Sequence, residues 1–365
     1  GNLVLNNSMT IINDYVFYKC SGLTGKIELP VNLTEIGDLP FYGCENVEMI
    51  FNIPETLTQI GRGSFQGLKS VTGAINLPKS MYYIPENAFY GCSGLYGSLK
   101  FPKTCTSISS GAFAGCTGLS GTLELSSNIK YIYSEAFLNC SGLSGTLIIS
   151  QNIKSVGKGA FKGCTGFDKL IIENGTYLTQ IEVSVFEKCT GFIGELIIPS
   201  SIKSISSSAF AYCSGFNGSL IIPREVEYIG SSAFAYCSGF NGLLDISNSE
   251  NGNRIIGESA FYKCSGFTGK LKIDDNICSI GAESFAYCSG FNYLSCYSKN
   301  ITIIPNRAFY YCTGFSSKLE LSMLYKSIGT EAFAGCSGFT GTLTLLDTYY
   351  GDGCFALFSG LTCYS

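Results

Sequence analysis

Cysteine is the residue with the widest chemical potential in this chain, because the 365 residues include 18 cysteines and no histidine. A thiolate can act as a nucleophile or bind a metal, and two thiols can form a disulfide. The absence of histidine removes the usual general base, the catalytic triads that need it, and imidazole metal ligands. Thirteen cysteines recur at one position of a repeating pattern: Cys20, Cys44, Cys92, Cys116, Cys140, Cys164, Cys189, Cys213, Cys237, Cys264, Cys288, Cys312 and Cys336.

The pattern around these cysteines favours packing over chemistry. No two of them form a Cys-x-x-Cys pair, so we expect no metal site and no cofactor. Leu68 and Phe358 occupy the same position in two copies, which indicates a buried apolar site that a free thiol can fill. Thiols of stacked copies would point in parallel, so they are expected to stay reduced. Only Cys354 and Cys363 have a spacing that allows, without requiring, a disulfide.

Other catalytic patterns are missing too. The chain has no Gly-x-Ser-x-Gly elbow and no Ser-x-x-Lys with its supporting motifs. The glycine-rich stretch Gly91-Cys-Ser-Gly94 recurs in most copies and precedes a strand, whereas a phosphate-binding loop precedes a helix. Gly94, Gly118 and their counterparts are instead expected to form tight corners of the coils. We therefore expect that the protein is not an enzyme.

The elements that position these residues come from an internal repeat. A phenylalanine recurs mostly every 24 residues, at 17, 41, 65, 89, 113, 137, 161, 186, 210, 234, 261, 285, 309 and 333, with a degenerate copy at 355. A fixed period of this length is typical of solenoids, whose coils must stack to bury an apolar core. Five residues before the phenylalanine stands an isoleucine or valine, which predicts a short strand. A longer alternating strand follows the cysteine, as at Leu99–Phe101 and Leu220–Ile222.

The predicted fold is a right-handed leucine-rich-repeat solenoid of about 14 coils of 24 residues. It should contain a parallel β-sheet, a second short β ladder and turns, with little helix. The predicted organisation is a solenoid over residues 1–346 and a degenerate C-terminal repeat or cap over 347–365.

Composition limits the classes of partner. The net charge is −4 and the isoelectric point is about 5.1, so no basic surface for nucleic acid or anionic lipid is expected. No apolar run reaches the ~18 residues of a transmembrane helix. The chain shows no signal peptide, which says little about its location because it begins with Gly1 and could be trimmed.

Two columns of outward residues are candidate contact surfaces. The outward residue of the longer strand is isoleucine in four consecutive coils, Ile148, Ile171, Ile197 and Ile221, where other coils have charged or polar residues. Stacking would join these into an exposed apolar stripe that contacts a partner protein. Alternatively, β-branched residues simply suit a strand, or the stripe forms a weak homodimer.

The second column follows the repeat phenylalanine by two positions. It contains Tyr212, Tyr236, Tyr287 and Tyr311, with Lys263 between them. Tyrosine is common at recognition surfaces because it offers a large contact area and loses little side-chain entropy. The alternative is that these rings only cover a corner of each coil.

The repeated phrase Ile-Gly-x-x-Ala-Phe-x-x-Cys-Ser-Gly, readable from Ile229 and in variant form from Ile84, resembles the BspA-like leucine-rich repeat over almost the whole chain. The resemblance implies an extracellular or cell-surface location and a role in adhesion. The implied partner is a protein, either a host extracellular matrix protein or another microbe's surface protein. A passive structural spacer or surface-layer scaffold that displays other domains is the alternative. Glycan recognition is a third reading, against which the absence of tryptophan counts.

Overall fold

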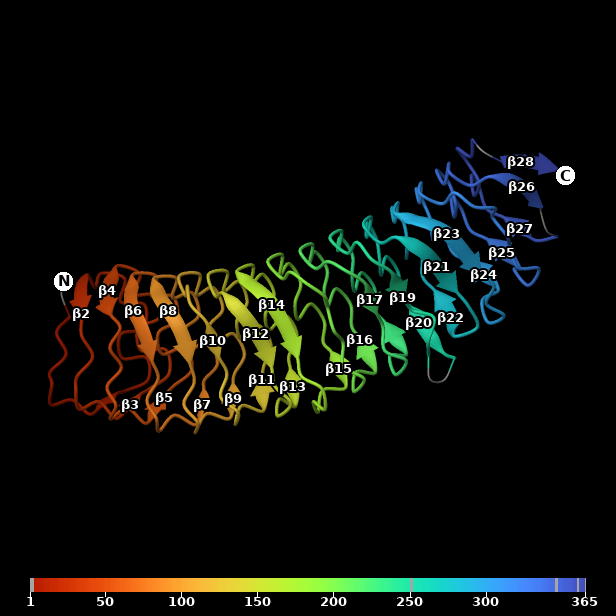
Figure 1. Cartoon of the computed structure of the whole chain (residues 1–365). Coiled ribbons are helices and arrows are strands. Elements are labelled where there is room, and N and C mark those ends of the chain that lie inside the picture. Colours follow the sequence, from red (N-terminus) through yellow and green to blue (C-terminus); the bar gives the residue numbers. More distant parts are fainter. Residues whose placement is uncertain (1–2, 250–251, 345–346, 360, 365) are drawn as a thin grey trace. The chain divides into compact units, whose positions relative to one another are not determined.

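The computed structural model describes residues 3–249, 252–344, 347–359 and 361–364. These residues form a parallel β-solenoid of the predicted repeat type, in which each coil consists of a short strand and turns and most coils also carry a longer strand (Figure 1). No α-helix occurs in the described part of the chain. The solenoid divides into two compact units. Unit 1 is Gly1–Leu178 with Lys188–Gly191, and unit 2 is Thr179–Glu187 with Phe192–Ser365.

In unit 1, strands of both sets pair in parallel with the equivalent strand of the next coil, except between β5 and β7 and between β10 and β12, which belong to separate sheets. The longer strands are β2 (Gly25–Ile27), β4 (Val47–Ile50), β6 (Val71–Asn76), β8 (Leu95–Lys100), β10 (Leu123–Glu124), β12 (Gly145–Ile149) and β14 (Phe167–Ile172). The short strands are β1 (Ile11–Ile12), β3 (Glu35–Ile36), β5 (Gln59–Ile60), β7 (Tyr83–Ile84), β9 (Ser107–Ile108), β11 (Tyr131–Ile132) and β13 (Ser155–Val156). The register is one period, as in Leu123 opposite Leu99, so equivalent side chains lie next to each other.

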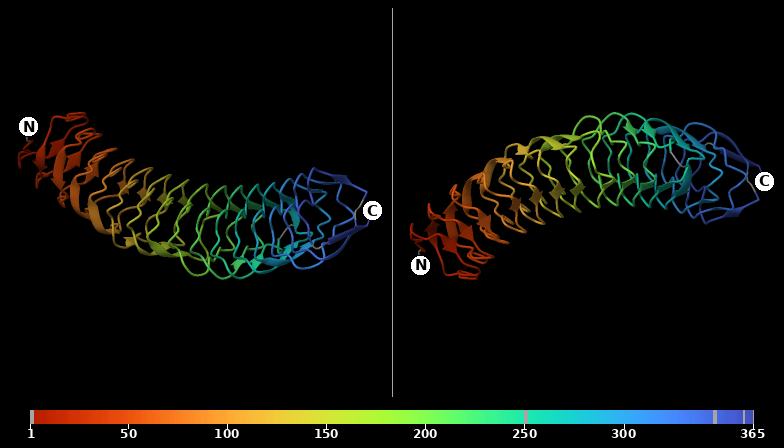
Figure 2. Two further views of the ribbon diagram at one scale, coloured as in Figure 1. Left: turned by 90° about the horizontal axis from the view of Figure 1, so that it is seen from above. Right: turned by 90° about the horizontal axis from the view of Figure 1, so that it is seen from below.

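Unit 2 repeats this arrangement. Its short strands are β15 (Gln180–Ile181), β16 (Ser204–Ile205), β18 (Tyr228–Ile229), β20 (Arg254–Ile256), β22 (Ile277–Ile280), β24 (Ile303–Ile304), β25 (Ser327–Ile328) and β27 (Tyr349–Tyr350). Its longer strands are β17 (Leu220–Ile221), β19 (Leu244–Asp245), β21 (Gly269–Ile273), β23 (Phe291–Cys296), β26 (Gly341–Thr344) and β28 (Leu361–Tyr364). Figure 2 shows the two sets on different sides of the coils. The pairing of β27 with β25 and of β28 with β26 extends the repeat pattern into the predicted cap, whose boundary at 346/347 stays a prediction.

The core of each unit consists of stacked equivalent side chains. The repeat phenylalanines lie face to face, as in Phe89 and Phe113, whose ring centroids are 5.1 Å apart with planes 9° apart. In unit 2 a second stack, including Phe240 and Phe267 at 5.0 Å, lies beside the first. Offset stacking at these separations adds about 0.5–1.5 kcal/mol per pair beyond the burial of area. The isoleucine or valine five residues before each repeat phenylalanine lies in the predicted short strand and is buried.

The cysteine column is a row of buried, reduced thiols. From Cys44 to Cys336, each sulfur of the column donates to the carbonyl oxygen of the phenylalanine in the preceding coil; the Cys116 Sγ to Phe89 O distance, for example, is 3.0 Å. Burial raises the pKa of Cys116 to about 12, so the thiol stays protonated and can donate. All the described cysteines are free, including Cys354, whereas the side chain of Cys363 lies outside the described residues.

Cys20 departs from the expected burial. It is exposed, because it belongs to the first coil and no described coil precedes it. Cys278 is half-buried, and Cys105 and Cys296 fill apolar core positions.

The glycine that follows the Cys-Ser or Cys-Thr pair is required for a reason other than the predicted tight corner. Gly142 does not need a positive φ; instead, a Cβ there would lie 2.3 Å from the carbonyl oxygen of Leu119 and 2.6 Å from that of Thr117. The same close approach recurs at Gly94 and Gly118. Glycine is therefore required because the backbones of neighbouring coils nearly touch.

One coil of unit 2 is longer than the others, because Phe234 and Phe261 are 27 residues apart instead of 24. A buried arginine forms hydrogen bonds beside this insertion. Arg254 is fully buried and donates to the carbonyl oxygens of Val226, Ile246, Pro223 and Asn248 at 2.5–2.9 Å. Burial lowers the pKa of its guanidinium to about 10, which still leaves it charged at neutral pH. The guanidinium thus gives the carbonyl groups around the inserted segment a hydrogen-bond donor.

Replacement of the close-approach glycine should destabilise the fold. We expect Gly142→Ala to lower the free energy of unfolding by about 3 kcal/mol, because rigid carbonyl groups block the added methyl. Gly22 holds the same repeat position, but nothing lies within 4 Å of its Cβ site, so Gly22→Ala is the matched control. Urea unfolding of both variants measures the difference. Equal stabilities would contradict the proposed contact.

Because burial raises the pKa of the column thiols, we expect the protein to lose stability at alkaline pH. Well below pH 9 the thiols are protonated in both states, so they add no pH dependence. Between the ordinary pKa of 9.0 and the folded value of about 12, the unfolded chain loses thiol protons that the folded chain retains. The free energy of unfolding should therefore fall as pH rises through this range. Urea unfolding at several pH values measures this, and fast alkylation of Cys116 in the native protein at pH 8 would contradict it.

Candidate interaction surfaces

Three of the four isoleucines of the predicted outward column lie on longer strands, Ile148 on β12, Ile171 on β14 and Ile221 on β17. Ile197 lies in a coil whose described residues form no longer strand, so its expected strand is absent. In unit 1, Ile148 of β12 lies directly opposite Ile171 of β14. The Ile148 side chain is exposed, whereas Ile171 is half-buried, less open than expected. Elsewhere in this column of unit 1, Lys100 and Glu124 form an ion pair at 2.8 Å. The outward column therefore carries aliphatic groups in some coils and paired charges in others.

Unit 2 presents the more open isoleucines. Ile197 is 66% exposed and Ile221 is 63% exposed, one repeat apart. Ile193 and Leu243, which sequence reasoning did not select, are also more than half exposed. The sequence does contain a signal for them, because each is an apolar residue at an outward position where the next coil has a polar residue. Ile193, for example, is replaced by Asn217 at the same position of the next coil. These four side chains of unit 2 are here named the aliphatic surface.

The tyrosine column occupies a strained turn. Tyr212, Tyr236, Tyr287 and Tyr311 have φ between 54° and 64°, and Lys263 has φ 58°. The equivalent residue in several other coils is glycine, as at Gly115 and Gly335, both with φ 75°. A left-handed backbone costs a residue with a Cβ about 1–2 kcal/mol relative to the right-handed form. The strain comes from placing large side chains where the turn favours glycine.

The tyrosine rings contact one another from coil to coil. Tyr212 and Tyr236 stack at 4.5 Å with planes 10° apart, and Tyr236 meets Tyr262 edge to face at 5.4 Å. Tyr262 and Tyr310, one position earlier in the repeat, complete a continuous row that sequence reasoning missed. The row contains Tyr212, Tyr236, Tyr262, Tyr287, Tyr310 and Tyr311 and is here named the tyrosine ladder. Each ring contact stabilises the fold by about 0.5–1.5 kcal/mol. This gain is similar in size to the cost of the left-handed backbone, so the two nearly cancel.

Lys263 lies in the middle of the tyrosine ladder. Its ammonium nitrogen is 5.1 Å, 5.3 Å and 5.4 Å from the ring centroids of Tyr236, Tyr262 and Tyr287. These distances are within the range of cation–π attraction. In the described part of the chain, no carboxylate lies within ion-pair distance of this nitrogen. Among the described residues, the groups that stabilise the charge of Lys263 are thus these three aromatic rings.

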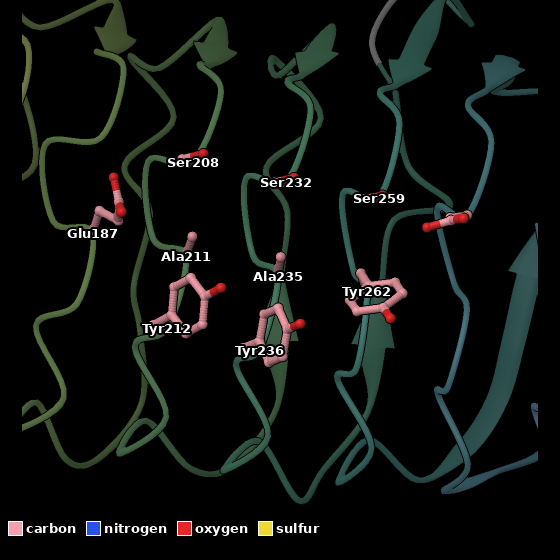
Figure 3. Close-up of a pocket in the computed structure, with 10 residues that line it drawn as sticks. Glu187, Ser208, Ala211, Tyr212, Ser232, Ala235, Tyr236, Ser259 and Tyr262 are labelled. Carbon is pink, nitrogen blue, oxygen red and sulfur yellow. The ribbon is translucent and has the colours of Figure 1, made fainter.

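Two shallow hollows flank the tyrosine ladder. The first, of about 300 Å³, is lined by Ser208, Ser232 and Ser259, by tyrosines, and by Glu187 and Glu283. Figure 3 shows the serines in one row and the rings of Tyr212 and Tyr236 side by side in another, their hydroxyls pointing the same way. Ala211 and Ala235 line it between the two rows.

The second hollow, of about 420 Å³, is centred on Lys263. Ser238, Ser265 and Ser289 from three consecutive coils line it together with Tyr236 and Tyr287. Every lining side chain can donate a hydrogen bond, and no carboxylate is among them. Tyr262 lines the first hollow, where burial raises the pKa of its hydroxyl. The tyrosine ladder is therefore rich in hydroxyl groups and poor in aliphatic ones.

Neither surface contains a metal-binding group. Among the described residues, no three His, Cys, Asp or Glu side chains come close enough to hold a metal ion. The searched residues also include no helix that is long and apolar enough to cross a bilayer.

Comparison with known proteins identifies the repeat. The model of the BspA type leucine rich repeat region, in six copies, matches residues 1–120, 84–217, 144–264, 217–340 and 254–362. A leucine-rich repeat protein from Bacteroides ovatus is 23% identical, with a TM-score of 0.66 over 100% of this chain and 84% of that one. A leucine rich cell surface protein from Faecalibacterium prausnitzii is 20% identical, with a TM-score of 0.49 over 96% of this chain and 88% of that one. No curated protein matches the sequence. The chain belongs to the family of BspA-type leucine-rich repeat proteins.

Proposed function

We propose that this chain is a non-catalytic protein-binding module that works outside the cell or on its surface. It would adhere to a host extracellular matrix protein or to another microbe's surface protein. The observation that carries the proposal is the aliphatic surface of unit 2, where Ile193, Ile197, Ile221 and Leu243 are each more than half exposed. Family membership supports the surface location, since the similar protein from Faecalibacterium prausnitzii is described as a cell surface protein.

The energetics favour a contact role for these side chains. Complete burial of one isoleucine against a partner contributes about 1.5–3 kcal/mol. Two such residues one coil apart could therefore dominate the affinity, as a few central residues do in most interfaces. In unit 1, Ile148 and Ile171 offer a smaller site of the same kind, because Ile171 is half-buried.

Two alternatives make different predictions. A spacer or surface-layer scaffold would show no saturable binding to any protein. A weak homodimer through the aliphatic surface would appear as concentration-dependent association in sedimentation experiments. It too should disappear when the isoleucines are replaced by aspartate.

Charge introduced on the aliphatic surface should abolish binding. In the double variant Ile197→Asp and Ile221→Asp, we expect at least a tenfold loss of affinity for immobilised extracellular matrix proteins, because a carboxylate would have to be desolvated at the contact. The fold should be unchanged, since both side chains point outward. Ser295→Asp, on the outward face of β23, is the matched control. Unchanged affinity of the double variant would place the contact elsewhere, and the absence of any binding by the native protein would favour the spacer.

A further inference from the structure

The tyrosine ladder has no evident role in stability. Its large residues hold a turn conformation that other coils give to glycine, and their stacking only offsets that strain. Its hollows differ from the aliphatic surface, because hydroxyl groups line them and alanine supplies the only aliphatic groups. A surface built in this way suits a ligand with many hydroxyl groups of its own.

We propose that the tyrosine ladder is a second binding site, which takes an extended glycan that carries an acidic sugar. The negative group of that sugar, a carboxylate or a sulfate ester, would lie in the hollow centred on Lys263. The neighbouring sugars would lie along the tyrosine rings and the rows of serines. The inference goes beyond protein binding by the aliphatic surface and does not depend on it.

The Lys263 hollow has the chemistry of a site for one anionic group. The ammonium nitrogen has aromatic neighbours and, among the described residues, no ion-pair partner. Ser238, Ser265 and Ser289 bring three hydroxyl donors from consecutive coils to the same hollow. Charge-assisted hydrogen bonds from such donors are the strong contacts for carboxylate and sulfate oxygens.

The neighbouring hollow limits the charge of the rest of the ligand. Glu187 and Glu283 line it, Glu283 at 3.7 Å from Arg307, and none of the described residues that line it is cationic, so this hollow does not favour a polyanion such as a nucleic acid or a polyphosphate. A carboxylate oxygen can instead accept hydrogen bonds from neutral sugar hydroxyls. Most of the ligand should therefore be uncharged, with its negative groups widely spaced.

The geometry of the ladder favours a repeating ligand over a folded protein. Equivalent tyrosines and serines occur once per coil, so the same contacts repeat along the stack. A chain of sugars also repeats hydroxyl groups and apolar C–H faces at regular intervals. Tyrosine rings can pack against such faces while their hydroxyls bind sugar oxygens. This compensates for the absence of tryptophan.

Binding to defined glycans tests the proposal. Affinities would be measured by biolayer interferometry for neutral oligosaccharides that carry one terminal sialic acid carboxylate, for the same chains with one sulfate ester instead, and for the uncharged chains. Chondroitin sulfate, whose negative groups are closely spaced, serves as the polyanion that should bind more weakly. We expect saturable binding of at least one acidic glycan, weakened by salt. Lys263→Met should lower that affinity at least tenfold. Lys272→Met, which replaces an exposed lysine of β21 in the same coil, should leave it unchanged.

A second variant keeps the test independent of folding. Tyr236→Gly introduces the residue that other coils use at this turn, so the protein should stay folded while its glycan affinity falls. The Ile197→Asp variant should bind glycan like the native protein, which separates failure here from failure of the protein-binding proposal. The proposal is overturned if no acidic glycan binds, if Lys263→Met binds as well as the native protein, or if an acidic peptide competes equally well.

Discussion

The structure depends on one constraint, the parallel alignment of each coil with the next at a register of one repeat. Because equivalent residues are neighbours, each position must tolerate contact with another copy of itself. Phenylalanine satisfies this by stacking, and cysteine satisfies it by donating its S–H to a carbonyl of the preceding coil. Glycine satisfies it where the backbones nearly touch, as at Gly142. The near identity of the coils is thus a consequence of their packing.

The same constraint shapes the surface. A residue that points outward is repeated in space at the strand spacing, so one substitution has little effect whereas the same substitution in several coils makes a continuous face. Like charges would repel at this distance, and the outward column of unit 1 pairs Lys100 with Glu124 instead. Tyrosine and isoleucine can recur without this penalty, which is why both can form rows.

Most of the fold could be predicted from the sequence because the period gives the register directly. The phenylalanine, isoleucine and cysteine columns all lie where the repeat predicts. The glycine after Cys-Ser was misread as a corner, since sequence spacing does not reveal how closely two backbones approach. Cys20 was expected to be buried, but its coil has no described coil before it. Tyr262 and Tyr310 were missed because they stand one position away from the column and join it only through their ring contacts. The exposure of Ile197 and the partial burial of Ile171 likewise depend on neighbours that a one-dimensional pattern cannot place.

Arg254 has a consequence for how such arrays diversify. An inserted stretch would normally leave main-chain carbonyls without donors, and the cost would select against it. A single long cationic side chain that reaches several of these oxygens removes most of that cost while the short strands on either side keep their pairing. A coil with such an arginine could accept further residues in its loop. Novel surface features could therefore evolve, or be grafted, at this coil without disturbing its neighbours.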